Sequence, residues 1–437
     1  MTPLLDAYFT CLNRRQPWRW CGRVIESVGQ TIESAGPPAS VGEGCEILDR
    51  SGRAHSAEVI GFRGSNVLSM PLETTDGIGF GDSVLALGTR PAIEVGPGLM
   101  GRVLNALGEP IDGGPRLRAP AVLTLDGKVR SPLDRAPIRE PLATGIRAID
   151  GLLTTGRGQR VGVFGGSGVG KSTLIGMMTR NTEADVTVVG LVGERGREVG
   201  EFLDGALGEE GRARSVVIVS TSDQSPLLRM RAALAATTVA EFFAAQGRTV
   251  LLVLDSLTRF AMAAREIGLA AGEPPTNKGY TPSVFSRLAR LIERAGNFRF
   301  GSITAFYTVL MEGDDQQDPL VDAVRSLLDG HIVLSRARAS EGWYPPVEVL
   351  DSISRLMPSV TEAAQREQAA LLRRLFAVYA RSEDLVRIGA YKPGSDADLD
   401  RALRARASLR AFLIQESSEQ APLAETLRHL ARLAAEI

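Results

Sequence analysis

The amino-acid sequence predicts an α/β protein with a central parallel sheet, a small β-barrel before it and a helical domain after it. Between residues 159 and 340, apolar β-branched runs alternate with helical patterns, which is typical of a parallel sheet covered on both faces. Short β-prone runs separated by glycine-rich turns precede this region, and amphipathic helical segments follow it. We therefore predict an N-terminal segment plus barrel over 1–91, a core over 92–358 and a helical domain over 359–437.

The composition is that of an ordinary soluble globular protein. A chain of 437 residues is too long for one compact core and favours about three domains. The net charge of −1 and the lack of a recognisable RNA motif argue against a nucleic-acid partner. Three cysteines without metal-ligand spacing fit a reducing compartment, and the sequence has neither a secretory signal nor a membrane-spanning run. We therefore expect a cytoplasmic protein.

The N-terminal part divides into a helical pattern and a strand-rich region. Residues 1–16 have apolar side chains at helical spacing and a basic end, so this helix could dock on a partner, lie on a membrane or fold onto its own domain. The lone His55 is expected at the surface. The following strands are expected to form a barrel or a sandwich, and they cover 22–28, 45–48, 57–62, 66–70 and 83–87.

The remaining elements follow from glycine, proline and hydrophobic patterns. Residues 92–158 are rich in glycine and proline, and we expect them to wrap the core in extended form. Helices are expected over 361–381, 396–416 and 421–436. Ligands of parallel sheets usually bind at the carboxyl ends of the strands. The predicted core strands cover 161–164, 186–192, 215–219, 250–254, 302–307 and 331–334.

A glycine-rich loop between the first core strand and a helical run has the pattern G-x-x-x-x-G-K-[ST]. Glycines allow backbone N–H groups to surround a polyphosphate, and the helix dipole favours the same anion. Lys171 would reach the β- and γ-phosphates, and Ser172 would contact Mg²⁺. The alternative is a chance glycine turn containing a lysine. We expect ATP and Mg²⁺ to bind at this loop, which comprises Gly165, Gly166, Ser167, Gly168, Val169, Gly170, Lys171, Ser172 and Thr173.

Two carboxylates follow core strands and are candidates for the chemistry. Asp255 ends an apolar strand in the manner of a Walker B element and would hold Mg²⁺, although it could instead cap the next helix. Glu194 follows the neighbouring strand and could activate water as a general base. The alternative for Glu194 is a solvated charge on a loop.

These motifs together resemble the catalytic subunits of rotary F-type and V-type ATPases, most closely the ATPases of type III protein export. The resemblance covers roughly 20–410 and includes the phosphate loop, Val-Gly-Glu-Arg-Gly-Arg-Glu at 192–198, Leu-Asp-Ser-Leu-Thr-Arg-Phe-Ala at 254–261 and Leu-Asp-Ser-Ile-Ser-Arg at 350–355. It implies a P-loop core of the RecA-like type. The Gln316-Gln317 pair and the Gly389-Ala390-Tyr391 triplet favour the flagellar branch. A virulence injectisome ATPase and an F/V-type ATP synthase catalytic subunit are the alternatives.

The resemblance also implies roles for individual residues. Glu194 is the catalytic carboxylate, and Arg195 and Arg259 lie near the γ-phosphate. Tyr344 matches the aromatic residue that stacks on adenine, although a core tyrosine before a proline turn is the alternative. Arg355 matches the arginine finger that reaches into the site of the neighbouring subunit.

One chain thus carries both a phosphate cradle and a finger, so identical copies placed head to tail would complete one another's sites as a homohexamer. The resemblance further implies four kinds of partner: a stator-type regulator protein, a coiled-coil central stalk, an export-gate membrane protein and chaperone–substrate complexes. It also implies that the protein is peripheral to the export apparatus of the inner membrane. A ring-shaped RNA translocase and a non-enzymatic scaffold are rival classes. Glu194 argues against the scaffold.

Overall fold

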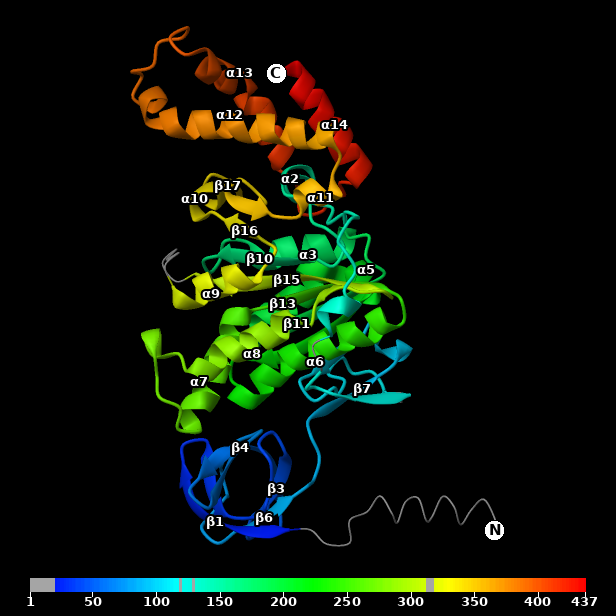
Figure 1. Ribbon diagram of the computed structural model, residues 1–437, viewed down its shortest axis with the longest axis vertical. Coiled ribbons are helices and arrows are strands. Elements are labelled where there is room, and N and C mark those ends of the chain that lie inside the picture. The colour runs from blue at the N-terminus through cyan, green and yellow to red at the C-terminus, as the bar shows by residue number, and fades with distance from the viewer. Residues whose placement is uncertain (1–19, 118–119, 128–129, 312–317) are drawn as a thin grey trace, which may run out of the picture.

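The computed structural model describes residues 20–117, 120–127, 130–311 and 318–437. The barrel, the central sheet with its helices and the C-terminal helices follow one another along the long axis of the molecule (Figure 1). The helix predicted over 1–16 lies outside the described residues. Within the described ranges, no helix combines the length and the apolar character that crossing a bilayer requires.

The N-terminal strands form a closed six-stranded barrel, which decides between the two expected architectures. The strand order around it is β1-β2-β5-β4-β3-β6, and alternate side chains such as Val24 and Ile47 fill its interior. His55, expected at the surface, is instead buried and lies 3.1 Å from the Asp49 carboxylate. The strands are β1 (Cys21–Val28), β2 (Thr31–Ala35), β3 (Gly44–Leu48), β4 (Ala54–Arg63), β5 (Asn66–Pro71) and β6 (Ser83–Ala86).

The region that was expected to wrap the core is instead partly built into it. β8 (Val103–Asn105) pairs in parallel with β12 at the edge of the main sheet, and β7 (Ala92–Val95) pairs with β9 (Ala121–Thr124). Short helical turns lie at η1 (Pro97–Leu99) and η2 (Pro132–Asp134), and α2 (Arg147–Leu152) ends the region.

The central sheet has the strand order β17-β16-β10-β15-β13-β11-β12-β8. All six predicted core strands are present and parallel, whereas β17 and the two-residue β14 are antiparallel additions. β17 was not predicted, although the alternation of apolar and polar residues at its start is typical of a strand. The strands are β10 (Arg160–Gly165), β11 (Val186–Glu194), β12 (Ser215–Thr221), β13 (Thr249–Asp255), β14 (Gly296–Asn297), β15 (Ser302–Leu310), β16 (Gly330–Leu334) and β17 (Val347–Ser354).

Helices cover both faces of this sheet, as the apolar runs predicted. Neighbouring strand residues belong to different hydrophobic clusters: the cluster of Val188 includes residues of α6 and α8, whereas the cluster of Val189 includes residues of α3. The helical segments of the core are α3 (Lys171–Asn181), α4 (Gly196–Glu201), η3 (Phe202–Leu207), α5 (Gly208–Ala213), α6 (Pro226–Ala245), α7 (Leu257–Ala270), η4 (Asn277–Gly279), α8 (Pro282–Ile292), α9 (Pro319–Leu327) and α10 (Arg336–Ser340).

The C-terminal helices stack on the end of the core. Leu372 and Leu375, on the predicted apolar face, are buried. α2 contacts three helices of this region, so a segment that precedes the phosphate loop in sequence anchors them. The helices are α11 (Met357–Val360), α12 (Ala363–Arg387), α13 (Ala397–Leu413) and α14 (Leu423–Glu436).

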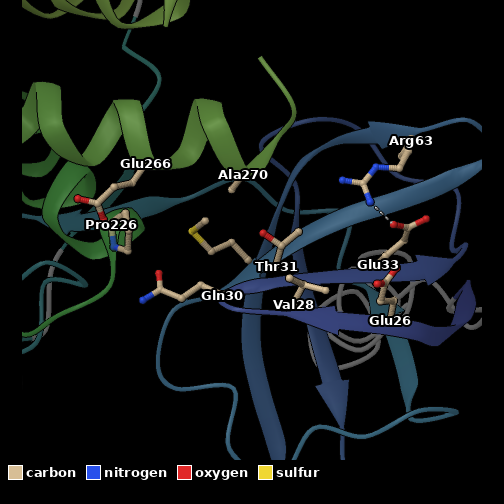
Figure 2. A pocket seen from close by; sticks show the side chains of 10 residues that line it. Glu26, Val28, Gln30, Thr31, Glu33, Arg63, Pro226, Glu266 and Ala270 are labelled. Carbon is tan, nitrogen blue, oxygen red and sulfur yellow. Dashed lines mark hydrogen bonds and ion pairs between the residues drawn. The ribbon is translucent and has the colours of Figure 1, made fainter. Parts of the chain in front are cut away.

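The barrel and the core are joined by polar contacts around two cavities. Glu58 of β4 pairs with Arg231 of α6, and both side chains are about one-tenth exposed. Figure 2 shows a neighbouring cavity of about 360 Å³, with the Glu33–Arg63 ion pair on its barrel side and Glu266 on its core side. None of the predicted site residues lines this cavity, so the expected chemistry lies elsewhere.

Candidate active site

The phosphate loop lies where the strand–loop–helix pattern predicts it. β10 ends at Gly165, α3 begins at Lys171, and the loop between them lies at the carboxyl end of the strand. Gly168 and Gly170 have φ values of 75° and 98°, a left-handed conformation that side chains with a Cβ atom rarely adopt. The backbone of the loop therefore depends on glycine at these two positions.

Lys171 is held inside the loop. Its Nζ atom donates hydrogen bonds to the carbonyl oxygens of Gly165 and Gly166, at 3.0 and 2.5 Å. Burial lowers the pKa of Lys171, and the nearby carboxylates of Asp255 and Glu194 oppose this effect. The ammonium group is thus held by the phosphate loop, and it interacts electrostatically with the predicted metal ligand Asp255 and the predicted base Glu194.

A cavity of about 810 Å³ adjoins this loop. It is large enough for a mononucleotide. Residues from the phosphate loop, from the ends of β11 and β13, and from α3 and α7 line it. The predicted residues that it brings together are Ser167, Gly168, Gly170, Lys171, Ser172, Thr173, Glu194, Arg195, Asp255 and Arg259.

Asp255 is the last residue of β13 and is buried. The alternative role as a helix cap is wrong, because the hydroxyl of Ser256 accepts the capping hydrogen bond from the N–H of Arg259 at 3.2 Å. The Asp255 carboxylate instead accepts a hydrogen bond of 2.5 Å from Thr308. Burial raises its pKa, whereas the Thr308 hydrogen bond and the charge of Lys171 act in the opposite direction.

The donor set near Asp255 fits Mg²⁺ bound mainly through phosphate and water. Ser172 is exposed, and both Ser172 and Asp255 line the cavity. Across the described residues, no group of three or more histidine, cysteine or acidic side chains could hold a metal. Mg²⁺ retains water and phosphate ligands and needs only one or two protein oxygens, so this sparse donor set suits it.

Glu194 ends β11 beside a bulge in the pairing with β12. It is half-buried and belongs to the strand rather than to a loop, and the carboxylates of Asp255 and Glu198 both act on it. Burial, then Asp255, then Glu198 raise the pKa of Glu194 to about 8. The same contact lowers the pKa of Glu198, because Glu198 accepts a hydrogen bond from the protonated Glu194.

Two arginines extend from the elements that carry these carboxylates. Arg259, in the first turn of α7, lies against Gly193, and its Nε atom is buried without a hydrogen-bond partner among the described residues. Arg195 precedes α4, is exposed and lies 3.9 Å from Glu198. Both line the cavity, in positions open to an anionic ligand.

Tyr344 and Arg355 lie outside that cavity lining. Tyr344 is 43% exposed and adjoins the phosphate loop, where a Cβ atom added to Gly170 would lie 3.4 Å from its ring. The core-tyrosine alternative is therefore wrong. Arg355 directly follows β17, has an exposed side chain and is anchored by its N–H, which donates to the Asp329 carbonyl at 3.0 Å. Arg355 does not line the cavity next to the phosphate loop of its own chain.

Three residues of the site were not identified from the sequence. Thr308 carries the hydrogen bond to Asp255 but shows no local signal, because it lies in the middle of an apolar strand. Arg336 lines the cavity and donates to the carbonyl of Ser167 at 3.4 Å. Glu198 lies in the motif that contains Glu194, and its helical position four residues later was the available signal.

Family models match three separate regions of the chain. The nucleotide-binding domain of the ATP synthase alpha/beta family matches residues 145–354, and the beta-barrel domain of that family matches 24–88. The T3SS EscN ATPase C-terminal domain matches 361–432.

Individual proteins are similar over most of their length. The flagellum-specific ATP synthase of Treponema pallidum is 51% identical over 431 residues, covering 98% of this chain and 96% of that protein. The SPI-2 type 3 secretion system ATPase of Salmonella typhimurium is 50% identical over 404 residues, covering 92% of each.

Two solved structures of a type III secretion ATPase are also similar to this chain. The assembled ATPase EscN of the enteropathogenic E. coli type III secretion system aligns with a TM-score of 0.90 at 42% identity, covering 94% of this chain and 100% of that chain. EscN in complex with its central stalk EscO aligns with a TM-score of 0.87 at 41% identity and the same coverage. The chain therefore belongs to the ATP synthase alpha/beta family and, within it, to the flagellum-specific and type III secretion ATPases.

Proposed function

We propose that this chain hydrolyses ATP to ADP and phosphate and that the reaction energises type III protein export, most specifically flagellar export. The proposal rests on one observation: Lys171 at the start of α3, Glu194 at the end of β11 and Asp255 at the end of β13 all line one cavity. Each residue meets a separate requirement of phosphoryl transfer. Lys171 places positive charge near the phosphates, Glu194 can activate water, and Asp255 can bind the metal ion.

The phosphate loop binds the nucleotide. Its backbone N–H groups and the start of α3 face the polyphosphate, and the Lys171 ammonium exchanges loop carbonyls for β- and γ-phosphate oxygens. Ser172 and Asp255 hold Mg²⁺. When bound, this ion neutralises charge on the β- and γ-phosphates.

Glu194 accepts a proton from the attacking water. The water oxygen bonds to the γ-phosphorus, the bond to the β,γ-bridging oxygen breaks, and ADP leaves with that oxygen. Glu194 must be ionised to act in this way, and its neighbours Asp255 and Glu198 oppose ionisation. Arg259 and Arg195 compensate by placing positive charge at the cavity.

Arg355 completes the site of a neighbouring copy. Its exposed side chain and its absence from the cavity of its own chain support action in trans. Subunits joined head to tail through such contacts close into a ring, which we propose to be a homohexamer. The similarity to EscN, described as an assembled ATPase, supports assembly of this kind.

The proposed partners are a coiled-coil central stalk, a stator-type regulator, an export-gate membrane protein and chaperone–substrate complexes, with the ring at the cytoplasmic face of the inner membrane. The structure of EscN with its central stalk EscO supports the stalk. Sequence identities of 51% and 50% to a flagellar and an injectisome ATPase do not separate the two systems. The flagellar assignment rests on the sequence at Gln316-Gln317 and at Gly389 to Tyr391, and of these only the second lies within the described residues.

Steady-state phosphate release tests the reaction. Glu194→Gln should bind ATP with near-normal affinity and lose about 10²- to 10⁴-fold in turnover, because it removes a general base and preserves the shape. Near-normal turnover in this variant would contradict the role of Glu194. A wild-type chain that binds ATP without releasing phosphate would instead support the scaffold alternative.

A gene disruption tests the export system. Loss of the flagellar filament with unchanged effector secretion supports the flagellar assignment. Loss of effector secretion with normal filaments supports the injectisome alternative.

A further inference from the structure

The loop over 414–422, between α13 and α14, contacts two parts of the nucleotide site. Ser417 lines the cavity, and its carbonyl accepts a hydrogen bond of 2.6 Å from Arg180 near the end of α3. The backbone N–H of Gln415 donates to the carbonyl of Tyr344 at 2.8 Å. A loop of the C-terminal helices thus holds the backbone of the residue proposed to stack on adenine.

The side chain of Gln415 is 1% exposed and uses both ends of its amide. Its Oε1 atom accepts from the N–H of Arg147 at 3.0 Å. Its Nε2 atom donates to the carbonyls of Gly145 and Glu419, at 2.8 and 3.1 Å. Because a buried amide left without partners is costly, these hydrogen bonds fix the loop to the turn before α2.

The turn before α2, which contains Gly145, packs closely against the phosphate-loop helix α3. A Cβ atom on Gly145 would overlap Asn181, the last residue of α3. The guanidinium of Arg147 donates to the carbonyl of Phe412 at 2.9 Å and pairs with Glu419. Gln415 therefore spans the distance between a turn packed on α3 and the backbone of Tyr344.

We propose that Gln415 is a positioning residue that holds Tyr344 against the phosphate loop, so that the adenine base contributes to nucleotide affinity. The proposal rests on the proposed stacking of adenine on Tyr344. Gln415 acts through the backbone of Tyr344, and its loss therefore weakens binding of the base and leaves binding of the phosphates intact.

The test uses Gln415→Met in the full-length chain, since methionine has a similar length and makes none of the three side-chain hydrogen bonds. The affinities for ADP and for pyrophosphate are measured by calorimetry at a protein concentration where wild type and variant have the same assembly state. ADP affinity should fall about tenfold and pyrophosphate affinity should stay within about twofold. Equal losses for both ligands, or an unchanged ADP affinity, would overturn the proposal.

Gln365→Met is the matched control. Gln365 on α12 also joins the C-terminal helices to the α2 region, donating to the carbonyl of Asp150 at 3.2 Å and to the hydroxyl of Thr154 at 2.8 Å. These hydrogen bonds involve neither Tyr344 nor the loop over 414–422. The control should retain wild-type ADP affinity even where it lowers the melting temperature. An ADP loss equal to that of Gln415→Met would show general loosening and overturn the specific role.

Tyr344→Ala separates this inference from the function on which it rests. If Gln415 acts through Tyr344, Gln415→Met should cause no further loss of ADP affinity in the Tyr344→Ala background. An additive loss would overturn the positioning role. A Tyr344→Ala variant with unchanged ADP affinity would overturn adenine stacking itself.

Discussion

The hydroxyl of Thr308 on β15 donates a 2.5 Å hydrogen bond to Oδ1 of Asp255 at the end of β13. This contact orients the carboxylate that we propose as the magnesium ligand, and it favours the ionised form that a metal requires. The contact exists because β13 and β15 are parallel neighbours, so that residues far apart in sequence end at the same edge of the sheet.

Thr308→Val removes this hydrogen bond and nearly preserves side-chain volume. Asp255 then loses its orienting donor, and burial raises its pKa without that opposing effect. We expect the Mg²⁺ concentration for half-maximal ATPase activity to rise about 10-fold or more. A magnesium titration at saturating ATP checks this, and an unchanged midpoint would contradict the orienting role of Thr308.

The pH dependence of hydrolysis should report the ionisation of Glu194. Its pKa is raised to about 8, and it acts as a base only after losing its proton. The value of kcat/KM, which follows ionisations of the free enzyme, should therefore rise with pH through the neutral range and level off above about pH 8. Measured profiles that stay flat from neutral to alkaline pH would argue against this assignment.

Glu198→Gln tests the cause of that shift. The substitution removes a carboxylate that raises the pKa of Glu194, and glutamine can still serve in the capping box at the start of α4. The rising limb of kcat/KM should consequently move to lower pH in this variant. Movement to higher pH, or no movement, would show that Glu198 does not control Glu194.

The buried ion pair between Glu58 and Arg231 should matter for stability. Arg231→Met leaves the Glu58 carboxylate buried without its cation, which costs about 3 kcal/mol of folding free energy. The pKa of Glu58 is already raised by burial, and losing Arg231 raises it further, so the folded chain binds this proton more tightly than the unfolded chain. Stability therefore falls as pH rises above the unfolded-state value, and the melting temperature should drop more at about pH 8 than at about pH 5.

Two further variants complete this measurement. Glu58→Leu combined with Arg231→Met should recover most of the lost melting temperature, because no unpaired charge remains. Arg63→Met is the control, and it breaks the Glu33–Arg63 pair of Figure 2. The arginine side chain is 61% exposed and Glu33, at 12% exposed, keeps a hydrogen bond from the side chain of Asn66, so this variant should cost at most about 1 kcal/mol. Equal losses of melting temperature for Arg231→Met and Arg63→Met would contradict the greater cost of removing a buried arginine.

Local patterns in the sequence were sufficient to predict the phosphate loop and the main charged residues beside it. Strand periodicity followed by glycine and lysine located the phosphate loop and Lys171, and apolar strands ending in a carboxylate located Asp255 and Glu194. The six parallel core strands and five of the six barrel strands were also predicted, since each of these has a continuous or alternating apolar run.

The supporting contacts could not be predicted in the same way. Thr308 meets Asp255 only because two strands pair, and Gln415 meets Tyr344 only because the C-terminal helices fold back onto the core. The strand β2 is five residues long and contains a glutamate, so its pattern is too weak to identify. Long-range packing, which leaves no periodic signal, decides all of these features.

A mixed-subunit assay tests most directly the claim that neighbouring copies complete one another's sites. Glu194→Gln and Arg355→Ala subunits should each have little ATPase activity alone. After dissociation and reassembly at equal amounts, about a quarter of the interfaces should combine an intact Glu194 with an intact Arg355, and activity should reappear in that proportion. A mixture as inactive as its components, in rings shown to contain both variants, would contradict a site shared between subunits.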